Sequence, residues 1–238
     1  MTTVHALGAA AGAAALVAML GAPAMAAVVV SIENPGVSNT SQTNFSELGV
    51  ETFDNRATGE NLSFTSDFGG TSSYTGDYTN VQVWDNGSWG GVDNTNYAVA
   101  LGAGTSYTIQ LNKSANYFGY YQLALSGGNN DLEFWNGNSL VAAFSYADIL
   151  SHMTPGHLGS PYAGQTQNEY FGFLNFNFTD GDRYDRVVFS NTGSDGFESD
   201  NHTVGLLVPE PATWAMLIAG FGLVGLMSRR RRALEALS

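Results

Sequence analysis

Short apolar runs separated by turn residues fill the middle of the chain, between residues 27 and 208. In the segment 106–111 apolar side chains alternate with polar ones, which is the period of a half-buried β-strand. Leu132–Trp135 and Leu140–Ser145 flank an Asn-Gly turn and predict a β-hairpin. Further strands are expected at Tyr117–Leu125, Tyr170–Phe178, Arg186–Ser190 and His202–Val208, and only Tyr146–His152 has helical character. This pattern predicts an all-β fold, specifically a jelly-roll-like antiparallel β-sandwich.

Charge and cysteine content exclude several classes of protein. The chain has 238 residues, no Cys and a formal net charge of −13. Residues 27–208 hold nineteen acidic and only four basic side chains, a net charge of −15. Such a segment has no basic stripe to neutralise phosphates, so a nucleic-acid partner is excluded. The absence of Cys excludes a disulfide framework, a thiolate zinc site and a cysteine nucleophile.

The N-terminus has the organisation of a signal peptide. Residues 6–22 are apolar, Pro23 breaks any helix, and Ala24 and Ala26 are small residues at the positions that signal peptidase reads. Residues 1–26 are therefore predicted to form a removable signal peptide, with Ala27 or Val28 as the new N-terminus. This implies signal peptidase and the general secretion machinery as partners. The alternative is an Ala-rich buried helix.

The C-terminus combines an apolar stretch with a basic cluster. Residues 212–227 are uncharged, slightly fewer than the roughly 20 residues that span a bilayer. Four consecutive arginines follow at 229–232 and are typical of a stop-transfer signal that keeps the C-terminus in the cytoplasm. We expect one transmembrane helix here, with the middle segment on the outside of the membrane.

Nine residues of the tail carry a resemblance to a known sorting signal. A Pro-Glu-Pro triplet precedes a Trp-Ala pair, the apolar run and the arginine cluster: Pro209, Glu210, Pro211, Trp214, Ala215, Arg229, Arg230, Arg231 and Arg232. This order resembles the PEP-CTERM signal of exosortase-dependent bacterial surface proteins, in its Trp-Ala form. The resemblance implies that exosortase cleaves the tail near Pro-Glu-Pro. An ordinary single-pass anchor is the alternative.

A second resemblance lies just before the tail. The run Gly196–Val204 reads Gly-Phe-Glu-Ser-Asp-Asn-His-Thr-Val. Together with Tyr117-Phe118-Gly119 and Leu132–Trp135, it looks like a family of exosortase-dependent surface proteins that have one β-rich domain. The resemblance implies a location for the protein rather than a chemistry.

The same run contains the candidate metal ligands. Asp195, Glu198, Asp200 and Asn201 fall within seven residues, and oxygen ligands at this density suit Ca²⁺. A structural Ca²⁺ is therefore a hypothesis, although the spacing does not match an EF-hand. The alternative is a solvated acidic turn whose side chains bond their own backbone.

Aromatic and histidine side chains are the remaining candidates. Trp89 lies in a Gly-rich, loop-like context and is the candidate for stacking on a sugar ring, whereas most aromatic residues are expected in the core. For hydrolysis, His202 close to Asp200 is the candidate base, against the alternative of a structural histidine. No H-E-x-x-H or G-x-S-x-G motif occurs, and we expect no enzymatic activity.

These observations divide the chain into a signal peptide (1–26), a β-sandwich ectodomain (27–207) and a sorting signal (208–238). We expect an exported protein of a Gram-negative bacterium, held first in the inner membrane and then placed at the cell surface. The expected role is structural or adhesive, in the extracellular polysaccharide matrix. One alternative is a carbohydrate-binding module with a Ca²⁺-supported site, and another is a glycan-active hydrolase.

Overall fold

The described part of the chain is built almost entirely from β-strands. The computed structural model describes residues 25–85, 91–125, 127, 130–159, 167–208, 217–221 and 223. The strands found there are β1 (Val28–Ile32), β2 (Phe45–Glu51), β3 (Gly59–Ser66), β4 (Gly76–Trp84), β5 (Tyr97–Leu101), β6 (Thr105–Ala115), β7 (Tyr117–Leu125), β8 (Asn130–Asn136), β9 (Ser139–Phe144), β10 (Tyr170–Phe178), β11 (Tyr184–Asn191) and β12 (Gly196–Leu207). One short helix, α1 (Tyr146–Ser151), and 3-10 turns at Phe68–Gly70, Val92–Asn94 and Pro155–His157 lie between them.

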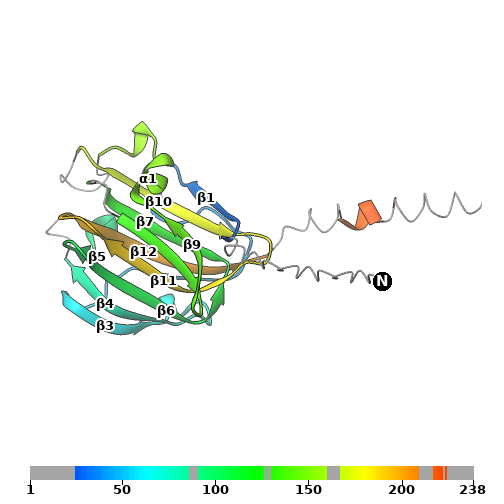
Figure 1. Ribbon diagram of the computed structural model, residues 1–238, viewed down its shortest axis with the longest axis horizontal. Coiled ribbons are helices and arrows are strands. Elements are labelled where there is room, and N and C mark those ends of the chain that lie inside the picture. The colour runs from blue at the N-terminus through cyan, green and yellow to red at the C-terminus, as the bar shows by residue number, and fades with distance from the viewer. Residues whose placement is uncertain are drawn as a thin grey trace, which may run out of the picture.

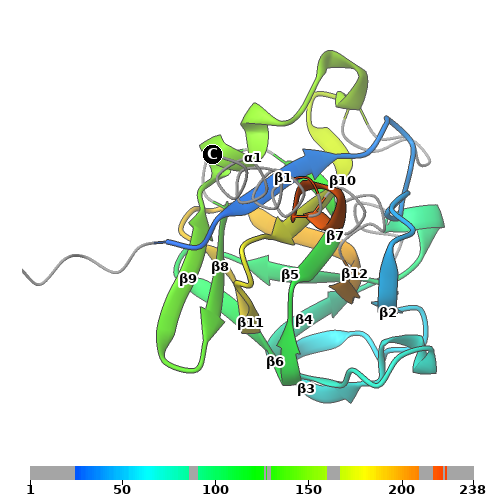
Figure 2. The same ribbon diagram turned by 90° about the vertical axis from the view of Figure 1, so that its right-hand side faces the viewer.

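These strands form one antiparallel sheet that curls on itself. Ten of them follow the order β1-β10-β7-β12-β5-β4-β6-β11-β8-β9, while β2 pairs with β12 and β3 pairs with β4. The two edges of this path meet at a seam, where the amide of Ala26, just before β1, donates to the carbonyl of Val141 in β9 at 2.8 Å. Figure 2 shows the resulting ring of strands, a nearly closed barrel.

The prediction of an all-β antiparallel domain is confirmed, but the two separate sheets of a jelly-roll sandwich are replaced by one continuous sheet. Strand β5 is hydrogen-bonded to β12 on one side and to β4 on the other, so it joins the two halves. Sequence periodicity specifies which face of a strand is apolar, and it carries no information about pairing across a corner of the sheet.

Several elements coincide with the sequence prediction. Strands β7 and β10 have the predicted limits, and β8 and β9 form the predicted hairpin, in which Asn136 is opposite Ser139. Strand β12 begins six residues earlier than predicted, at Gly196. The one predicted helix is α1, and a capping box fixes its start. The Asp148 carboxylate accepts from the Ser145 amide at 2.8 Å, and the Ser145 hydroxyl accepts from the Asp148 amide.

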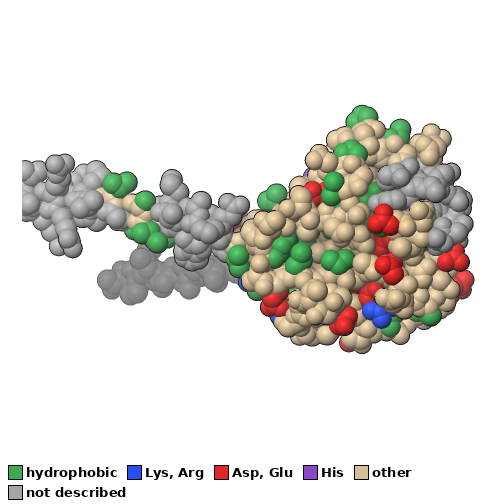
Figure 3. Space-filling view, turned by 180° about the vertical axis from the view of Figure 1, so that it is seen from behind, with side chains coloured by type: hydrophobic (Ala, Val, Ile, Leu, Met, Phe, Trp, Pro, Cys, Tyr) green, Lys and Arg blue, Asp and Glu red, His purple; other side chains and the backbone are tan. Residues whose placement is uncertain are grey.

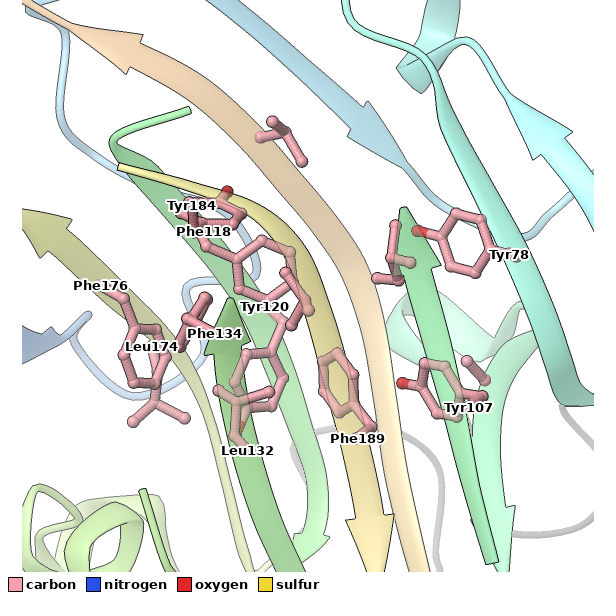
Figure 4. Close-up of a cluster of buried hydrophobic side chains, with 14 of the residues drawn as sticks. Tyr78, Tyr107, Phe118, Tyr120, Leu132, Phe134, Leu174, Phe176, Tyr184 and Phe189 are labelled. Atoms are coloured by element: carbon pink, nitrogen blue, oxygen red, sulfur yellow. The ribbon is translucent and has the colours of Figure 1, made fainter. Parts of the chain in front are cut away.

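Aromatic side chains fill the inside of the barrel. The largest fully buried side chains in the described part are all Tyr or Phe: Tyr74, Tyr78, Tyr97, Tyr107, Tyr117, Tyr120, Tyr121, Tyr184, Phe53, Phe68, Phe118 and Phe134. Figure 4 shows rings from β4, β6, β7, β8, β10 and β11 meeting there. The rings of Tyr120 and Phe176 stack at 6.0 Å, and those of Phe134 and Tyr184 meet edge to face at 5.1 Å. Apolar area therefore stabilises a chain that has no disulfide.

The first and last strands have their free ends at the same end of the barrel. Val28 of β1 is opposite Phe178 in β10, while Tyr117 of β7 is opposite Asn177 on one side and Gly205 of β12 on the other. Val28 and Gly205 thus lie at about the same level of the sheet, with two strands between them (Figure 1). We call this the tail end.

The opposite, far end of the barrel is the more acidic one on the face seen from behind. Strand β4 begins near the tail end, where Gly76 is opposite Leu111, so Trp84 at its other end lies toward the far end. Figure 3 shows acidic side chains gathered toward this far end, with few basic ones among them. On this face the far end is therefore the more acidic one, while the first strand begins and the last strand ends at the tail end.

Candidate functional site

The C-terminal tail begins where the last strand ends. Val208, directly after β12, still donates its amide to the carbonyl of Asn44 at 3.0 Å. The predicted motif residues Pro209, Glu210, Pro211, Trp214, Ala215 and the arginines 229–232 lie outside the described residues. Within the predicted span, residues 217–221 and 223 are helical and exposed. In the part of the chain that the structure describes, no helix has both the length and the apolar character needed to cross a bilayer.

Two of the three predicted signal-cleavage residues lie at the seam of the barrel. Ala26 supplies the seam hydrogen bond to Val141, and the amide of Ala27 donates to the Asp182 carboxylate at 3.1 Å. Ala24 lies outside the described residues. The predicted cleavage would therefore cut the chain within the first contacts of β1.

The Gly196–Val204 run is the first part of β12, and a β-bulge divides it. Asp200 is opposite Tyr121 in β7, but the next pair is Thr203 with Gly119, so β12 has one extra residue there. Asn201 adopts φ +49° at this point. Its side-chain amide donates to the carbonyl of Ser38 at 2.9 Å. The bulge breaks the alternation of faces, so Asp200 and His202 point to opposite sides of the sheet.

The side chain of His202 lies inside the barrel, fully buried. Its Nδ1 is 3.0 Å from the Tyr78 hydroxyl and its Nε2 is 3.0 Å from Oγ of Ser199, which is 2.6 Å from the Tyr107 hydroxyl. In Figure 4 both tyrosine hydroxyls point toward β12. The imidazole stacks on Phe189 at 5.0 Å. Burial lowers the pKa of His202 to about 3, so the ring is neutral.

Asp200 is fully buried on the outer side of β12, and its two carboxylate oxygens bind backbone amides. Oδ2 accepts from Val92 at 2.9 Å and Oδ1 accepts from Asn201 at 2.7 Å. Burial raises the pKa of Asp200 well above its ordinary value, although both amide contacts favour the charged form. Because the bulge separates Asp200 from His202, the structure does not bring these two residues together as an acid–base pair.

Glu198 is the first polar residue of this run and has the least favourable surroundings. It is 7% exposed, and its Oε2 atom has no hydrogen-bond partner. Burial, followed by repulsion from Glu169, raises the pKa of Glu198 to about 8. A buried, unsatisfied carboxyl group costs free energy and calls for a physical explanation.

The four residues that the sequence suggested as Ca²⁺ ligands do not share one site. Asp195 is exposed in the turn before β12, and its carbonyl accepts from the side chain of Asn191. Asp200 binds backbone amides, and the side-chain amide of Asn201 binds Ser38. Throughout the described ranges, no three His, Asp or Glu side chains are arranged to hold a metal ion together. Of the four, only Glu198 retains an unused oxygen that is buried.

Two adjoining hollows follow β3 and β4 near the far end. Their volumes are about 200 and 250 Å³, and both are lined by Glu60 and Gln82. Trp84 lines one and Asn61 the other. The side chains of Glu60, Asn61 and Gln82 make no hydrogen bond to another described residue. We call this the β3–β4 groove. The predicted sugar-stacking residue, Trp89, lies outside the described residues.

The order of elements, an acidic β-barrel followed by a Pro-Glu-Pro triplet, an apolar run and an arginine cluster, is that of an exported protein with a C-terminal membrane signal. Residues 207–232 match the family described as PEP-CTERM protein-sorting motif. The chain therefore carries a PEP-CTERM signal, which marks exported proteins that exosortase processes and sorts to the cell surface. A comparison with curated proteins gave no match.

Sequence reasoning missed the partners of the β12 residues. Tyr78 and Tyr107, which bind His202 and Ser199, come from β4 and β6, and no local pattern connects them to β12. Glu169, the neighbour of Glu198, precedes β10 and lies in no motif. The only signal in the sequence is the unusual density of polar residues in a strand that is otherwise central to the sheet.

Proposed function

We propose that the mature domain is a structural or adhesive protein of the extracellular polysaccharide matrix. The precursor passes through the general secretion machinery of a Gram-negative cell, loses residues 1–26 to signal peptidase and stays in the inner membrane by its C-terminal helix. Exosortase then cleaves the tail and the barrel reaches the cell surface. The PEP-CTERM match supports export and sorting, and the matrix role is our extension of it.

One observation carries this proposal. The sorting motif starts at Leu207, the last residue of β12, and β1 begins at the same end of the barrel. A barrel held this way directs its far end, with its acidic side chains, away from the membrane (Figures 1 and 3). A negatively charged, rigid module fits a hydrated matrix because net charge favours solubility and opposes self-association.

The processing step is tested by mass spectrometry of the protein recovered from the cell surface. We expect a C-terminus near Pro209–Pro211 and no peptide that contains the arginines 229–232. Replacing Pro209, Glu210 and Pro211 by alanine is expected to leave the full chain in the membrane fraction, whereas Pro155→Ala serves as a control outside the tail. An intact arginine cluster on surface protein contradicts exosortase processing.

The matrix role is tested separately, by fractionating cells that export the protein. We expect the processed protein to co-purify with extracellular polysaccharide and to be released when that polysaccharide is degraded enzymatically. Processed protein that is found entirely free in the medium contradicts the matrix role and leaves the sorting step intact.

The β3–β4 groove favours a second candidate function, a carbohydrate-binding module. Its lining offers an indole ring and several amide and carboxylate groups with unused hydrogen-bonding capacity, which is the chemistry that binds a neutral sugar. A glycan array probed with and without Ca²⁺ tests this. We expect Trp84→Ala to abolish binding and Trp135→Ala, on β8, to leave it unchanged. An array without any bound glycan in either condition removes this candidate.

We propose no catalytic role for the domain, and the glycan-active hydrolase is the least supported alternative. The position of His202 supports this proposal, because its side chain is fully buried in the core and lies on the other side of the sheet from Asp200. A hydrolytic activity that His202→Gln abolishes in a folded protein contradicts it.

A further inference from the structure

A second, smaller apolar cluster covers the outer side of the sheet where β5, β7, β10 and β12 run together. Its buried members are Val92, Tyr97, Val99, Tyr121, Leu123, Ala124, Phe171 and Phe173. Glu198 lies within this region, because it is opposite Val99 in β5 and opposite Leu123 in β7. A carboxyl group in such surroundings has lost most of its water.

Two carboxylates in this region each have an oxygen without a partner. Oε2 of Glu198 and Oε2 of Glu169 are both buried, and neither has a hydrogen bond. The ion pairs in the described part of the chain use Glu51 and Glu47 instead, so no Lys or Arg neutralises this pair. Native proteins seldom leave such atoms unpaired, and an ion or water is the usual explanation when they do.

The register places the two residues near each other. Strands β12 and β10 lie on either side of β7, about 10 Å apart. Glu198 is opposite Leu123, and Glu169 directly precedes Tyr170, which is opposite Leu125. The two carboxylates are close enough to repel each other, since Glu169 contributes to the raised pKa of Glu198. A pair of this kind is unfavourable without a positive charge between its members.

We propose that Glu198 and Glu169 together bind one Ca²⁺ ion on the outer side of the barrel. Both ligands are hard oxygens, which Ca²⁺ prefers, and the chain has no cysteine thiolate for a softer metal. Ca²⁺ takes 6–8 oxygens, so backbone carbonyls and water complete its coordination. Of the four Ca²⁺ ligands that the sequence suggested, this site includes only Glu198. Its second carboxylate comes from Glu169, which the sequence did not suggest. It is independent of the proposed matrix role.

The experiment is a thermal melt of the exported chain, purified in detergent, in EGTA and in CaCl₂. A ligand that binds only the folded state raises the midpoint, by about 5–10 °C at 100 times the dissociation constant for a domain of this size. We expect this shift for the natural protein and its loss in Glu198→Gln and Glu169→Gln. Asp195→Asn, which removes an exposed carboxylate of the same acidic segment, is the matched control and keeps the shift.

Terbium luminescence gives a second measurement that does not depend on stability. Tb³⁺ replaces Ca²⁺ in oxygen sites and is sensitised by nearby tyrosines, and Tyr97 and Tyr121 belong to the same apolar cluster. We expect a signal that Ca²⁺ competes away and that Glu198→Gln reduces at least tenfold. A natural protein that shows neither a Ca²⁺-dependent midpoint nor a Tb³⁺ signal overturns the proposal. So does a shift that Glu198→Gln retains and Asp195→Asn loses.

Discussion

Glu51, in β2, and Glu198, in the neighbouring strand β12, are two carboxylates with almost the same burial and contrasting surroundings. Glu51 is 6% exposed and Glu198 is 7% exposed. Glu51, in β2, accepts the Phe53 amide at 2.8 Å on one oxygen and the Arg56 guanidinium on the other. Glu198 leaves Oε2 unpaired and has another carboxylate as its neighbour. Equal burial therefore leaves these two carboxyl groups with different numbers of hydrogen-bond and ion-pair partners, and those partners distinguish the two environments.

The two carboxyl groups show two ways in which this barrel can accommodate a buried acidic side chain. The Glu51 region contains its own counter-charge and its own amide donor, so its carboxylate is satisfied within the chain. The Glu198 region lacks both, so it requires a proton or a cation from outside. The first region is expected to be indifferent to Ca²⁺, and the second is expected to depend on it.

The largest expected loss of stability comes from removing the counter-charge of Glu51, which leaves its carboxylate without an ion-pair partner, as in Glu198. Arg56→Ala removes the guanidinium and leaves a buried carboxylate without its counter-charge, which should cost about 3 kcal/mol of unfolding free energy. Part of that loss comes from the Phe64 ring, over which the Arg56 guanidinium lies at 4.4 Å. Urea denaturation measures the change. Arg186→Ala, which removes a guanidinium lying over Trp135, is the control, and an equal loss there contradicts the comparison.

Glu198→Gln should stabilise the protein at alkaline pH when Ca²⁺ is chelated. The pKa of Glu198 is raised from its ordinary 4.5 to about 8, so the folded state holds a proton that the unfolded state releases. The contribution of Glu198 to the free energy of unfolding is fully present below pH 4.5 and is lost as the pH rises through 8. The advantage of Gln should therefore grow by up to about 2.7 kcal/mol between pH 6 and pH 8. Denaturation in EGTA at both pH values checks this.

A pH-independent difference between Glu198→Gln and the natural protein contradicts that expectation. It would mean that Glu198 is ionised in the folded state at both pH values, with a counter-charge already present. Asp131→Asn is a suitable comparison, because burial and then repulsion from Glu133 also raise the pKa of Asp131, but that residue is only partly buried. Its effect on the pH dependence should be small.

Glu51→Gln should have the opposite sign to Glu198→Gln at pH 8. The amide keeps an acceptor for the Phe53 amide but loses the ion pair with Arg56, so we expect a destabilisation of about 1–2 kcal/mol. The same urea experiment gives both values side by side. Equal signs for the two glutamine variants would show that the environments are not different after all.

The smallest effect is expected for an ion pair at the surface. Lys113 Nζ lies 2.8 Å from Glu47, and hydrogen bonds from Lys113 and Ser73 lower the pKa of Glu47 to about 2. Both side chains are solvated, so Lys113→Ala should lower the midpoint of thermal unfolding only slightly, and less in 1 M NaCl than in low salt. A loss as large as that of Arg56→Ala contradicts the role assigned to burial.

Much of the secondary structure follows from the sequence. The limits of β7 and β10, the β8–β9 hairpin and α1 depend on local alternation, an Asn-Gly turn and a Ser-Asp capping pair. The sorting signal is equally predictable from the sequence, because the Pro-Glu-Pro motif, the apolar run and the arginine cluster follow one another along the chain. Closure of the barrel was not predictable in this way, since it depends on β5 pairing with the distant strand β12 and on the contact between Ala26 and Val141.

The β12 run shows most clearly why the candidate site could not be predicted in full. A regular strand would place Asp200 and His202 on one face, which is the assumption behind an acid–base pair. The extra residue at Asn201 reverses that relation. Asn is one of the residue types that adopt a positive φ more readily than most, and here its side-chain amide also binds the carbonyl of Ser38. Glu169 is 29 residues from Glu198, so only the folded sheet relates the two.

The seam between β1 and β9 gives the maturation step a physical consequence. Ala26 holds the seam through a neutral hydrogen bond to Val141, and the Ala27 amide is 3.1 Å from the Asp182 carboxylate. The predicted cleavage between Ala26 and Ala27 would remove the first contact and turn the second into a bond between an α-ammonium group and a carboxylate. The bond to Asp182 would then join two full charges instead of a neutral amide and a carboxylate. After this cleavage, the attachment of β1 to the turn between β10 and β11 is expected to depend more strongly on ionic strength.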